Sequence, residues 1–562
     1  MVSQLNIVFQ FGWTCCNISS NMNHLNTQFD KYTKIWSGPK ETKFFDADCS
    51  IGKILFAFMR NNPTKICQIS VADGTALTHG EALAFGIRIA QQLKAFGLKQ
   101  DDVVGIIGTN TTYIMPLVLG CLLNCTPFHA ISPHNQEDTI KHLFCITRPK
   151  VIFCDGDIYE QVRAISKILK TKVYTMVQHR EELPKIEDLL APTETELYYV
   201  PEPLMLGGDQ TVAILCTSGT TGTPKGVCIS NIACQFDYGF VISQDVLLSF
   251  STIDSASGLF NMLFSCGHSA TRIITDQPYT AELLLDLVVK FRVTILTLTS
   301  QQVTMLINSS AISKEKLSSI RFLSIGGGNC YVPALLRIQE YLTAGFVSYG
   351  YALTECGGVA ANIGVAKPNS VGTIVSGVKL KILDEAGRSL GPNEPGEILV
   401  HNGKVWNGYY GNPNESKRIR DYQGWFHTGD IGYMDNENFL YVVDRQKDML
   451  RFHGMQYWPH EIEQVVAELP DIIEVCVFGL WNEVDGDAAA AAVVKLPESK
   501  LSEPDVVKYV AQRLVVEHKQ LHCGVFFMHE LPKTSSGKVM RSQARDLALG
   551  KKWVDQKYGL ID

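Results

Sequence analysis

The sequence predicts an α/β fold in which a large N-terminal body of parallel-rich sheets, flanked by helices, precedes a small mobile α+β C-terminal domain. The first observation is length, because a chain of 562 residues is too long for a single core and indicates several domains. The second is an alternation of short apolar runs with helical patterns from about Ile51 to Val400, which is typical of parallel sheets covered on both faces. The third is a charged joint at 444–448, followed by a βα-type module of a little over 110 residues.

The elements of the large body follow in order along the chain. Glu81–Phe96 has the apolar spacing of an amphipathic helix, and Gly97 supplies its stop signal. Ligands in folds of this kind bind beyond the carboxyl ends of the strands, so we expect a site in the loops that follow them. The apolar runs predicted as buried strands are Val103–Ile107, Val151–Cys154, Val212–Cys216, Val293–Thr297 and Phe322–Ile325.

We place the main domain boundary where the predicted strand Phe439–Val443 runs into the charged residues 444–448. Beyond it we expect a helix over Pro459–Leu469, a strand over Glu474–Phe478 and a helix over Glu503–Val516. The predicted organisation is an N-terminal extension and lead-in (1–50), a large domain (51–443) and a small C-terminal domain (444–562).

Composition and charge exclude several classes of function. The chain is 46% hydrophobic and 19% charged, which is ordinary for a globular protein. Its formal net charge is -7 and it has no basic arm, so neither nucleic acid nor an anionic membrane is an expected partner. The 16 cysteines are scattered and lack C-x-x-C pairs, which favours free thiols in a reducing compartment over zinc sites.

The segment Val103–Gln136 contains no Asp, Glu, Lys or Arg, but prolines and asparagines interrupt it. A buried strand–helix–strand unit explains this segment better than a membrane span does. The first 21 residues lack Lys and Arg, which argues against a signal peptide or an Arg-rich transit peptide. The C-terminal Leu560–Asp562 differs from a peroxisomal S-K-L-type signal, so we expect a cytoplasmic protein without a transmembrane segment.

Thr217–Gly226 is the most informative stretch of the chain. It reads Thr-Ser-Gly-Thr-Thr-Gly-Thr-Pro-Lys-Gly and directly follows a predicted strand. Glycines let the backbone approach a ligand, hydroxyls add donors, and Lys225 adds a positive charge, so the loop suits a polyphosphate. The Walker A pattern does not fit it. For this loop alone, a flexible linker rich in glycine and threonine is the alternative.

Four further segments carry groups suited to a nucleotide. In Ser348–Glu355 an aromatic ring beside a glycine can cover a purine, and a carboxylate next to a hydroxyl can hold Mg²⁺ on a phosphate. In Gly424–Asp430 the final carboxylate can accept from ribose hydroxyls. Singly, each segment also has a structural explanation, such as a core tyrosine or a surface ion pair. The remaining segments are Asp444–Arg445 with Arg451–Gly454, and Leu531–Arg541 with its late lysine, Lys538.

Taken together and in this order, the five segments resemble those of the adenylate-forming superfamily, which includes acyl-CoA synthetases, 4-coumarate–CoA ligases and beetle luciferases. The resemblance runs from about Thr75 to Arg541 and includes the landmarks Val371–Thr373 and Gly396–Ile398. It implies ATP and Mg²⁺ as cofactors, coenzyme A as a co-substrate and a small-molecule carboxylic acid as the substrate. By analogy with the family, a peroxisomal location is the alternative to a cytoplasmic one.

The resemblance also implies a role for each site residue. Thr217, Ser218, Gly219, Thr220, Thr221 and Gly222 would order over the β- and γ-phosphates, with Lys225 at the basic end of the loop. Gly326, Gly327 and Gly328 would form a backbone wall against adenine, Tyr351 after Gly350 would stack on the base, and Asp430 and Arg445 would grip the ribose. Thr354 would contact the α-phosphate, Glu355 would ligate Mg²⁺, and Lys538 would lie between the acid and the α-phosphate. Asp444 matches the hinge, and Gly454 matches the glycine beside the pantetheine tunnel.

The implied activity has two steps. ATP-dependent activation of the acid gives an acyl-adenylate and pyrophosphate, and transfer to coenzyme A then gives acyl-CoA and AMP. We expect a fatty acid of medium to long chain, because no basic or polar feature suggests an amino-acid substrate.

Three positions depart from the family pattern. The loop Ser249–Ala256 lacks the usual histidine, Arg451 stands where lysine is common, and Ala352 stands where glycine is common. The first two disfavour one alternative, a luciferase-like monooxygenase acting on an adenylated luciferin, because arginine does not replace a catalytic lysine faithfully. The intact charged residues of the site disfavour another alternative, a degenerate nucleotide-binding scaffold.

Overall fold

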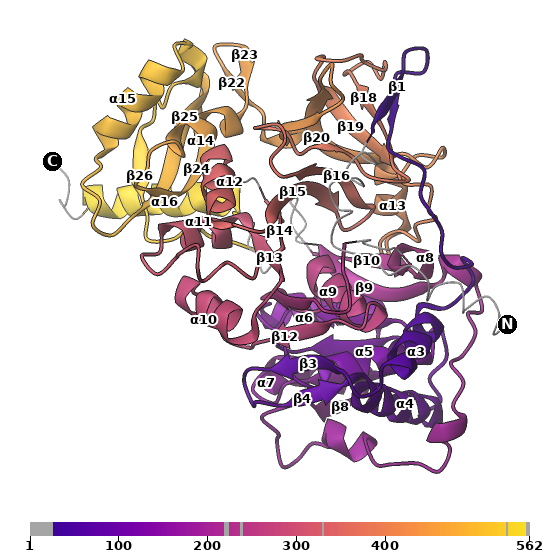
Figure 1. Cartoon of the computed structure of the whole chain (residues 1–562). Helices are drawn as coiled ribbons and strands as arrows, with labels where there is room; N and C mark the ends of the chain where they lie inside the picture. Colours follow the sequence, from indigo (N-terminus) through magenta and orange to yellow (C-terminus); the bar gives the residue numbers. More distant parts are fainter. Residues whose placement is uncertain (1–25, 218–223, 236–239, 329–330, 535–537, 558–562) are drawn as a thin grey trace.

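The computed structural model describes residues 26–217, 224–235, 240–328, 331–534 and 538–557. Three sheets build a large N-terminal domain, and a fourth sheet with its helices forms a small C-terminal domain (Figure 1). This arrangement confirms the predicted fold class. Within the described ranges, no helix is both long and apolar enough to cross a membrane. The cysteines that the structure describes are free thiols, and most of them are buried.

The first sheet has six strands in the order β10-β9-β6-β5-β7-β8, all parallel except β10. Its central strands are buried along their whole length, as their continuous apolar runs predict. The strands are β5 (Val104–Ile107), β6 (Phe128–Ile131), β7 (Val151–Cys154), β8 (Lys172–Thr175), β9 (Thr211–Thr217) and β10 (Lys225–Ser230). The helices of this half are α3 (Ile51–Asn61), α4 (His79–Ala95), α5 (Ile114–Leu123), α6 (Glu137–Thr147), α7 (Tyr159–Leu169) and α8 (Asn231–Cys234).

Helix α4 begins two residues before its predicted start because of a capping box. The Thr78 hydroxyl accepts from the backbone N–H of Glu81 at 3.2 Å, and the Glu81 carboxylate accepts from the backbone N–H of Thr78 at 2.8 Å. Each side chain satisfies a donor that the first helical turn leaves unpaired. The predicted helix is therefore confirmed, although its first two residues, His79 and Gly80, lie before the predicted start.

The second sheet has nine strands in the order β17-β16-β15-β14-β13-β11-β12-β3-β4, and its centre is parallel. The predicted strand Val293–Thr297 lies two residues further along, because the Thr294 hydroxyl donates to Asp245 at 2.7 Å before the strand begins. The strands are β3 (Ile66–Ser70), β4 (Ala76–Thr78), β11 (Val246–Ser249), β12 (Thr271–Ile274), β13 (Ile295–Thr299), β14 (Phe322–Gly326), β15 (Phe346–Leu353), β16 (Gly357–Ile363) and β17 (Thr373–Ile374). The helices of this half are α9 (Ala256–Gly267), α10 (Ala281–Phe291), α11 (Ser300–Asn308) and α12 (Val332–Tyr341).

The third sheet is antiparallel throughout, which the alternating pattern did not predict. Residues 26–50, expected as a lead-in, supply two of its strands, and Trp36 is fully buried and stacks on Phe29 with ring centroids 4.4 Å apart. In the order β1-β2-β18-β19-β20-β21, the strands are β1 (Gln28–Asp30), β2 (Ile35–Ser37), β18 (Lys379–Leu383), β19 (Gly396–His401), β20 (Phe426–Met434) and β21 (Leu440–Arg445). Helix α13 (Pro413–Ile419) lies in the long connection between β19 and β20.

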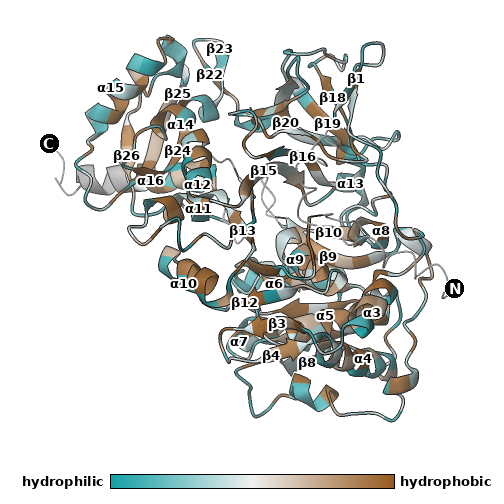
Figure 2. Ribbon diagram, in the orientation of Figure 1, coloured by the Kyte–Doolittle hydropathy of each residue, from teal (hydrophilic) through white to brown (hydrophobic). Residues whose placement is uncertain are grey.

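The small domain is one sheet with helices on both faces. Its two faces form separate apolar clusters, one beneath α14 and α15 and the other beneath α16. Figure 2 shows hydrophobic residues along the strands of this domain. The elements are β22 (Leu450–Phe452), β23 (Met455–Tyr457), α14 (Pro459–Val466), β24 (Ile472–Asn482), β25 (Gly486–Lys495), α15 (Glu503–Arg513), β26 (Val525–Phe527) and α16 (Arg541–Lys557).

A buried ion pair lies where the small domain joins the rest of the chain. The Arg541 guanidinium contacts the Glu463 carboxylate at 2.5 Å. The same carboxylate accepts a hydrogen bond from the backbone N–H of Val477 at 2.9 Å. Burial alone would raise the pKa of Glu463, but Arg541 and His460 lower it to about 2. Glu463 therefore stays ionised although only 5% of it is exposed.

We predict that Arg541→Met destabilises the small domain by about 3–5 kcal/mol, because it leaves the Glu463 carboxylate buried and unpaired. Hydrogen exchange in α14 and β24 would measure the loss. Arg513→Met is the matched control, since Arg513 pairs with Glu468 at 2.7 Å on the surface and its loss should cost at most about 1 kcal/mol. Equal effects of the two substitutions would contradict the prediction.

Candidate active site

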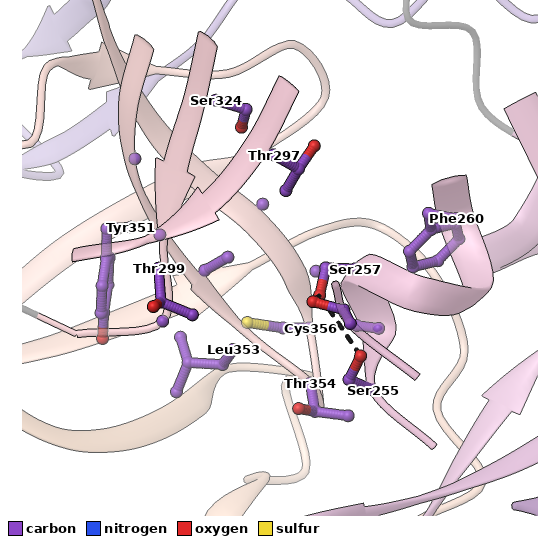
Figure 3. Close-up of a pocket in the computed structure, with 18 of the residues that line it drawn as sticks. Ser255, Ser257, Phe260, Thr297, Thr299, Ser324, Tyr351, Leu353, Thr354 and Cys356 are labelled. Atoms are coloured by element: carbon purple, nitrogen blue, oxygen red, sulfur yellow. Dashed lines mark hydrogen bonds between the residues drawn. The ribbon is translucent and has the colours of Figure 1, made fainter. Parts of the chain in front are cut away.

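A cleft of about 3710 Å³ lies between the sheets of the large domain and extends to the small domain. The carboxyl ends of β9, β13, β14 and β15 open into it, as expected for parallel sheets. Residues of β20, the 444–448 joint and the 533–543 segment complete its wall. Figure 3 shows Tyr351, Leu353 and Thr354 in this cleft, opposite the helix that carries Phe260.

The loop predicted to bind phosphates connects β9 to β10, which form an antiparallel hairpin. Thr217 and Lys225 face each other as the last pair of this hairpin, and both line the cleft. Ser218, Gly219, Thr220, Thr221 and Gly222 lie outside the described residues. The Lys225 ammonium contacts the Glu415 carboxylate at 2.5 Å and lies 4.9 Å from the centre of the Tyr409 ring.

Asp430 contacts two other predicted site residues, Tyr351 and Arg445. Its carboxylate accepts from the Tyr351 hydroxyl at 2.5 Å and from Arg445 Nε at 3.1 Å. Asp430 and Arg445 are direct partners across β20 and β21, whereas Tyr351 comes from β15 of another sheet. Burial and the Asp430 carboxylate raise the pKa of Tyr351 well above its usual range, so the phenol stays a hydrogen-bond donor.

The glycines predicted to line the base lie at the carboxyl ends of β14 and β15. Added Cβ atoms on Gly326, Gly327 and Gly328 would meet nothing within 4 Å, so this wall borders open cleft space. Gly327 has φ +87°, a conformation that favours glycine. Gly350 differs, because a Cβ there would lie 3.1 Å from the Ala360 carbonyl oxygen, and close packing of β16 explains this glycine.

Thr354 and Glu355 lie together where β15 ends, and both line the cleft. Glu355 Oε1 accepts from the Tyr409 hydroxyl at 2.8 Å. Mg²⁺ usually binds through one or two carboxylates together with substrate phosphates and waters, so this carboxylate, whose partner Tyr409 also contacts Lys225, fits the ion. Among the described residues, no cluster of three or more His, Cys, Asp and Glu side chains suits a metal held by protein alone.

Lys538 brings the small domain into the same cleft. Burial by the cleft walls and the Arg445 cation lower the pKa of its ammonium, whereas Asp430 and Glu355 act in the opposite direction. These groups influence one another because the structure places Lys538 among residues of the large domain. The Lys538 side chain is nevertheless exposed to solvent, because the cleft is open, so its walls shield the ammonium from bulk water only in part.

Gly454 lies apart from the other predicted residues. It occupies the turn between β22 and β23 with φ +77°, is exposed, and does not line the cleft. Asp444 lies at the joint, where its carboxylate accepts from the backbone N–H of Arg445 at 2.8 Å and of His460 at 3.1 Å. The structure thus brings the described residues that were predicted to act in adenylation to one cleft and places Gly454 outside it.

Sequence reasoning missed Tyr409 and Glu415, which hold Glu355 and Lys225 respectively. The local signal was present, because Asn412 caps helix α13 by accepting from the Glu415 backbone N–H at 3.3 Å, and Pro413 follows it. That pattern predicts a helix start, yet it says nothing about the distant side chains that Glu415 meets.

Two of the departures from the family pattern have clear places. Phe250 of the 249–256 loop packs edge to face on Tyr279, with ring centroids 5.1 Å apart, and also borders the cleft. Arg451 is exposed on β22 beside Gly454 rather than in the cleft. Neither position removes a contact among the residues gathered at Asp430.

A large three-sheet domain and a small domain that share a cleft, with a lysine of the small domain near carboxylates of the large one, are the arrangement of the adenylate-forming enzymes. The family model of the AMP-binding enzymes matches residues 55–410, and that of the AMP-binding enzyme C-terminal domain matches residues 461–538. The chain belongs to this adenylate-forming superfamily.

Individual relatives agree with this membership. 4-Coumarate–CoA ligase 1 of Arabidopsis thaliana is 30% identical over 524 residues, which cover 88% of this chain and 92% of that protein. Luciferin 4-monooxygenase of Photuris pensylvanica is 27% identical and covers 83% of this chain and 89% of that protein. The crystal structure of ATP-bound MatB from Rhodopseudomonas palustris superposes with a TM-score of 0.79 at 24% identity, covering 90% of this chain and 99% of that one.

We predict that Lys538→Ala slows pyrophosphate release by about 10²–10³-fold while the fold survives, because a positioned charge at the reacting phosphate is lost. Lys500→Ala is the control, since Lys500 is exposed in the same domain. Near-normal release by the Lys538 variant would remove this lysine from the adenylation step.

The lowered pKa of Lys538 predicts a pH dependence. The protonated ammonium is the useful form, so adenylation should decline as pH rises through a pKa below that of an ordinary lysine. Lys538→Arg should move this decline to higher pH, because arginine stays charged. We expect the arginine variant to be slower at every pH, because the planar guanidinium differs in shape from the compact ammonium. A pH profile of pyrophosphate release that is unchanged in the arginine variant would contradict the assignment.

Proposed function

We propose that this protein is an acid–thiol ligase that forms an acyl-adenylate from ATP and a carboxylic acid and transfers the acyl group to coenzyme A. The observation that carries the proposal is the position of Lys538, which reaches from the small domain into a cleft lined by Glu355, Asp430 and Arg445. Because these groups come from two domains, their convergence is hard to explain by the stability of either domain alone.

The first step brings together two anions, the acid carboxylate and the α-phosphate. Its transition state therefore needs fixed positive charge and donors. We assign Lys538 to the line of attack, Thr354 to the α-phosphate, and Lys225 with the 217–222 loop to the β- and γ-phosphates. Glu355 would hold Mg²⁺, which neutralises phosphate charge when bound. Asp430 and Arg445 would hold the ribose, and Tyr351 and Gly326–Gly328 would flank the base.

The second step needs a thiol at the same carbonyl, and Lys538 occupies that approach. We propose that the small domain (444–562) turns about Asp444, so that Lys538 leaves and the face with Gly454 enters. The exposed position of Gly454, outside the cleft, and the place of Asp444 at the end of β21, next to the small domain, support this motion.

The acid that we propose is of medium to long chain, and the protein is proposed to act in the cytoplasm. The luciferase-like alternative receives support from the luciferin monooxygenase relative, but Arg451 and the histidine-free 249–256 loop disfavour it. A degenerate scaffold would bind nucleotide without turnover, which the intact charged residues of the cleft disfavour.

The deciding experiment measures pyrophosphate release from ATP and Mg²⁺ with acids from acetate to palmitate, cinnamates and luciferin, with and without coenzyme A. Release with one class of acid, and thioester only with coenzyme A, is the expected result. Release without thioester formation would point to another acceptor. Light emission with luciferin would favour the monooxygenase, and ATP binding without any release would favour the scaffold.

We predict that Asp444→Pro spares adenylation and suppresses thioester formation, because proline restricts the residue that the hinge must turn. Single-turnover assays separate the two steps. Asp444→Ala is the matched control, since it removes the same carboxylate contacts without the restriction. Equal loss of both steps in the proline variant would argue against domain rotation.

A further inference from the structure

A row of hydroxyls crosses the floor of the cleft below the glycine wall. In the register of the nine-stranded sheet, Ser249 of β11 pairs with Thr297 of β13, Thr297 with Ser324 of β14, and Ser324 with Ser348 of β15. Residues paired in neighbouring parallel strands point to the same face of a sheet. Four strands therefore present a hydroxyl at one level on one face.

Three of these hydroxyls border the cleft, namely those of Thr297, Ser324 and Ser348. None of the three hydrogen-bonds to any described residue, although Ser348 is only 8% exposed. Ser249 differs, because its hydroxyl already accepts from the backbone N–H of Ser251 at 3.2 Å. None of the three is among the buried polar atoms of the described residues that lack a partner, so each hydroxyl is open to the cleft, where a ligand or water can bind it.

The levels above and below the hydroxyl row have different chemistry. Two residues toward the carboxyl end, Thr299 pairs with Gly326 at the proposed nucleotide site. An apolar row lies two residues from the hydroxyl row, toward the amino ends of the strands. Its members pair in the same register and are Leu247, Ile295, Phe322 and Phe346. All four line the cleft, and Phe322 and Phe346 contact edge to face with centroids 5.2 Å apart.

Helix α9 covers this face of the sheet from the other side of the cleft. Phe260 and Phe264 lie one turn apart on it, and both line the cleft. Figure 3 shows Phe260 across the cavity from Thr297 and Ser324 on their neighbouring strands. A molecule between sheet and helix would thus meet aromatic rings on one side and a hydroxyl level, then an apolar level, on the other.

From these layers we infer that the acid substrate carries a hydroxyl or carbonyl oxygen in its middle and an apolar chain beyond it. Each level is one two-residue step of about 7 Å from the next. With the carboxylate beside Thr299, at the edge of the proposed nucleotide site, an oxygen about 7 Å away meets Thr297, Ser324 and Ser348, and the tail meets Phe322 and Phe346. The inference rests on the proposed function and refines its medium-chain acid.

A plain fatty acid fits this channel less well. It would put methylene groups against the hydroxyls and displace any water that satisfies them, and a site with polar groups left unpaired discriminates against such a ligand. A mid-chain oxygen replaces that water. Two or three neutral hydrogen bonds correspond to a preference of about 10–100-fold.

The test compares kcat/KM for pyrophosphate release with decanoic, 6-hydroxydecanoic and 10-hydroxydecanoic acids, which share one chain length. We expect the 6-hydroxy acid to exceed decanoic acid by about 10–100-fold, the value of those hydrogen bonds. The 10-hydroxy acid should gain nothing, because its oxygen would lie at the apolar level. Equal rates for decanoic and 6-hydroxydecanoic acids would overturn the inference and leave the ligase function intact, whereas no release with any acid would overturn both.

Substitutions then locate the preference. Thr297→Val with Ser324→Ala should bring the 6-hydroxy acid down to the rate of decanoic acid, and each single change should remove part of the difference. Ser318→Ala, an exposed hydroxyl just before β14, is the control and should keep the preference. Nucleotide affinity that matches the unchanged enzyme shows that a variant is folded. A preference that survives in the folded double variant would overturn the inference.

Discussion

The Asp430 carboxylate connects the nine-stranded sheet, the antiparallel sheet and the interdomain joint at one point in the cleft. One oxygen accepts from the Tyr351 hydroxyl of the nine-stranded sheet, and the other contacts the Arg445 guanidinium at the end of β21. A carboxylate that is 5% exposed is stable only when such partners satisfy it, because an unpaired buried charge is costly. These contacts add to the apolar core that the two sheets share, and they hold the Arg445 side chain at the interdomain joint, where it borders the cleft.

The parallel sheets divide the cleft into levels by their own periodicity. Side chains on one face recur every second residue, and parallel pairing aligns these residues across strands. Along β14, Gly326 lies at the carboxyl end, the hydroxyl row follows two residues earlier at Ser324, and the apolar row follows two residues before that at Phe322. Chemistry that acts on phosphates and recognition of the acid can therefore occupy one sheet without interfering, since the strands separate them along their length.

Much of this arrangement could be predicted from the sequence. The strands of the central sheets are continuous apolar runs, the loop after β9 stands out by its glycines and hydroxyls, and Lys538 is indicated by its place in the ordered segments that resemble the family. The antiparallel sheet could not be predicted in the same way, because β1 and β2 are three residues each and their hairpin joins the sheet only through the pairing of β2 with β18, far along the chain. The contacts of Glu415 and Tyr409, and the hydroxyl row, arise from register and helix placement, which no local pattern contains.

The pairing of β2 with β18 also has a consequence for biosynthesis. Ser37 pairs with Lys379, a partner 342 positions later in the chain. Ribosomes add about 5–20 residues per second, so the first strands would wait roughly 20–70 s for that partner. During this interval Trp36 has no core to enter, although it is fully buried in the finished fold. The amino-terminal strands are thus among the last parts of the large domain to be secured during synthesis, and a chaperone that covers apolar segments would find them available.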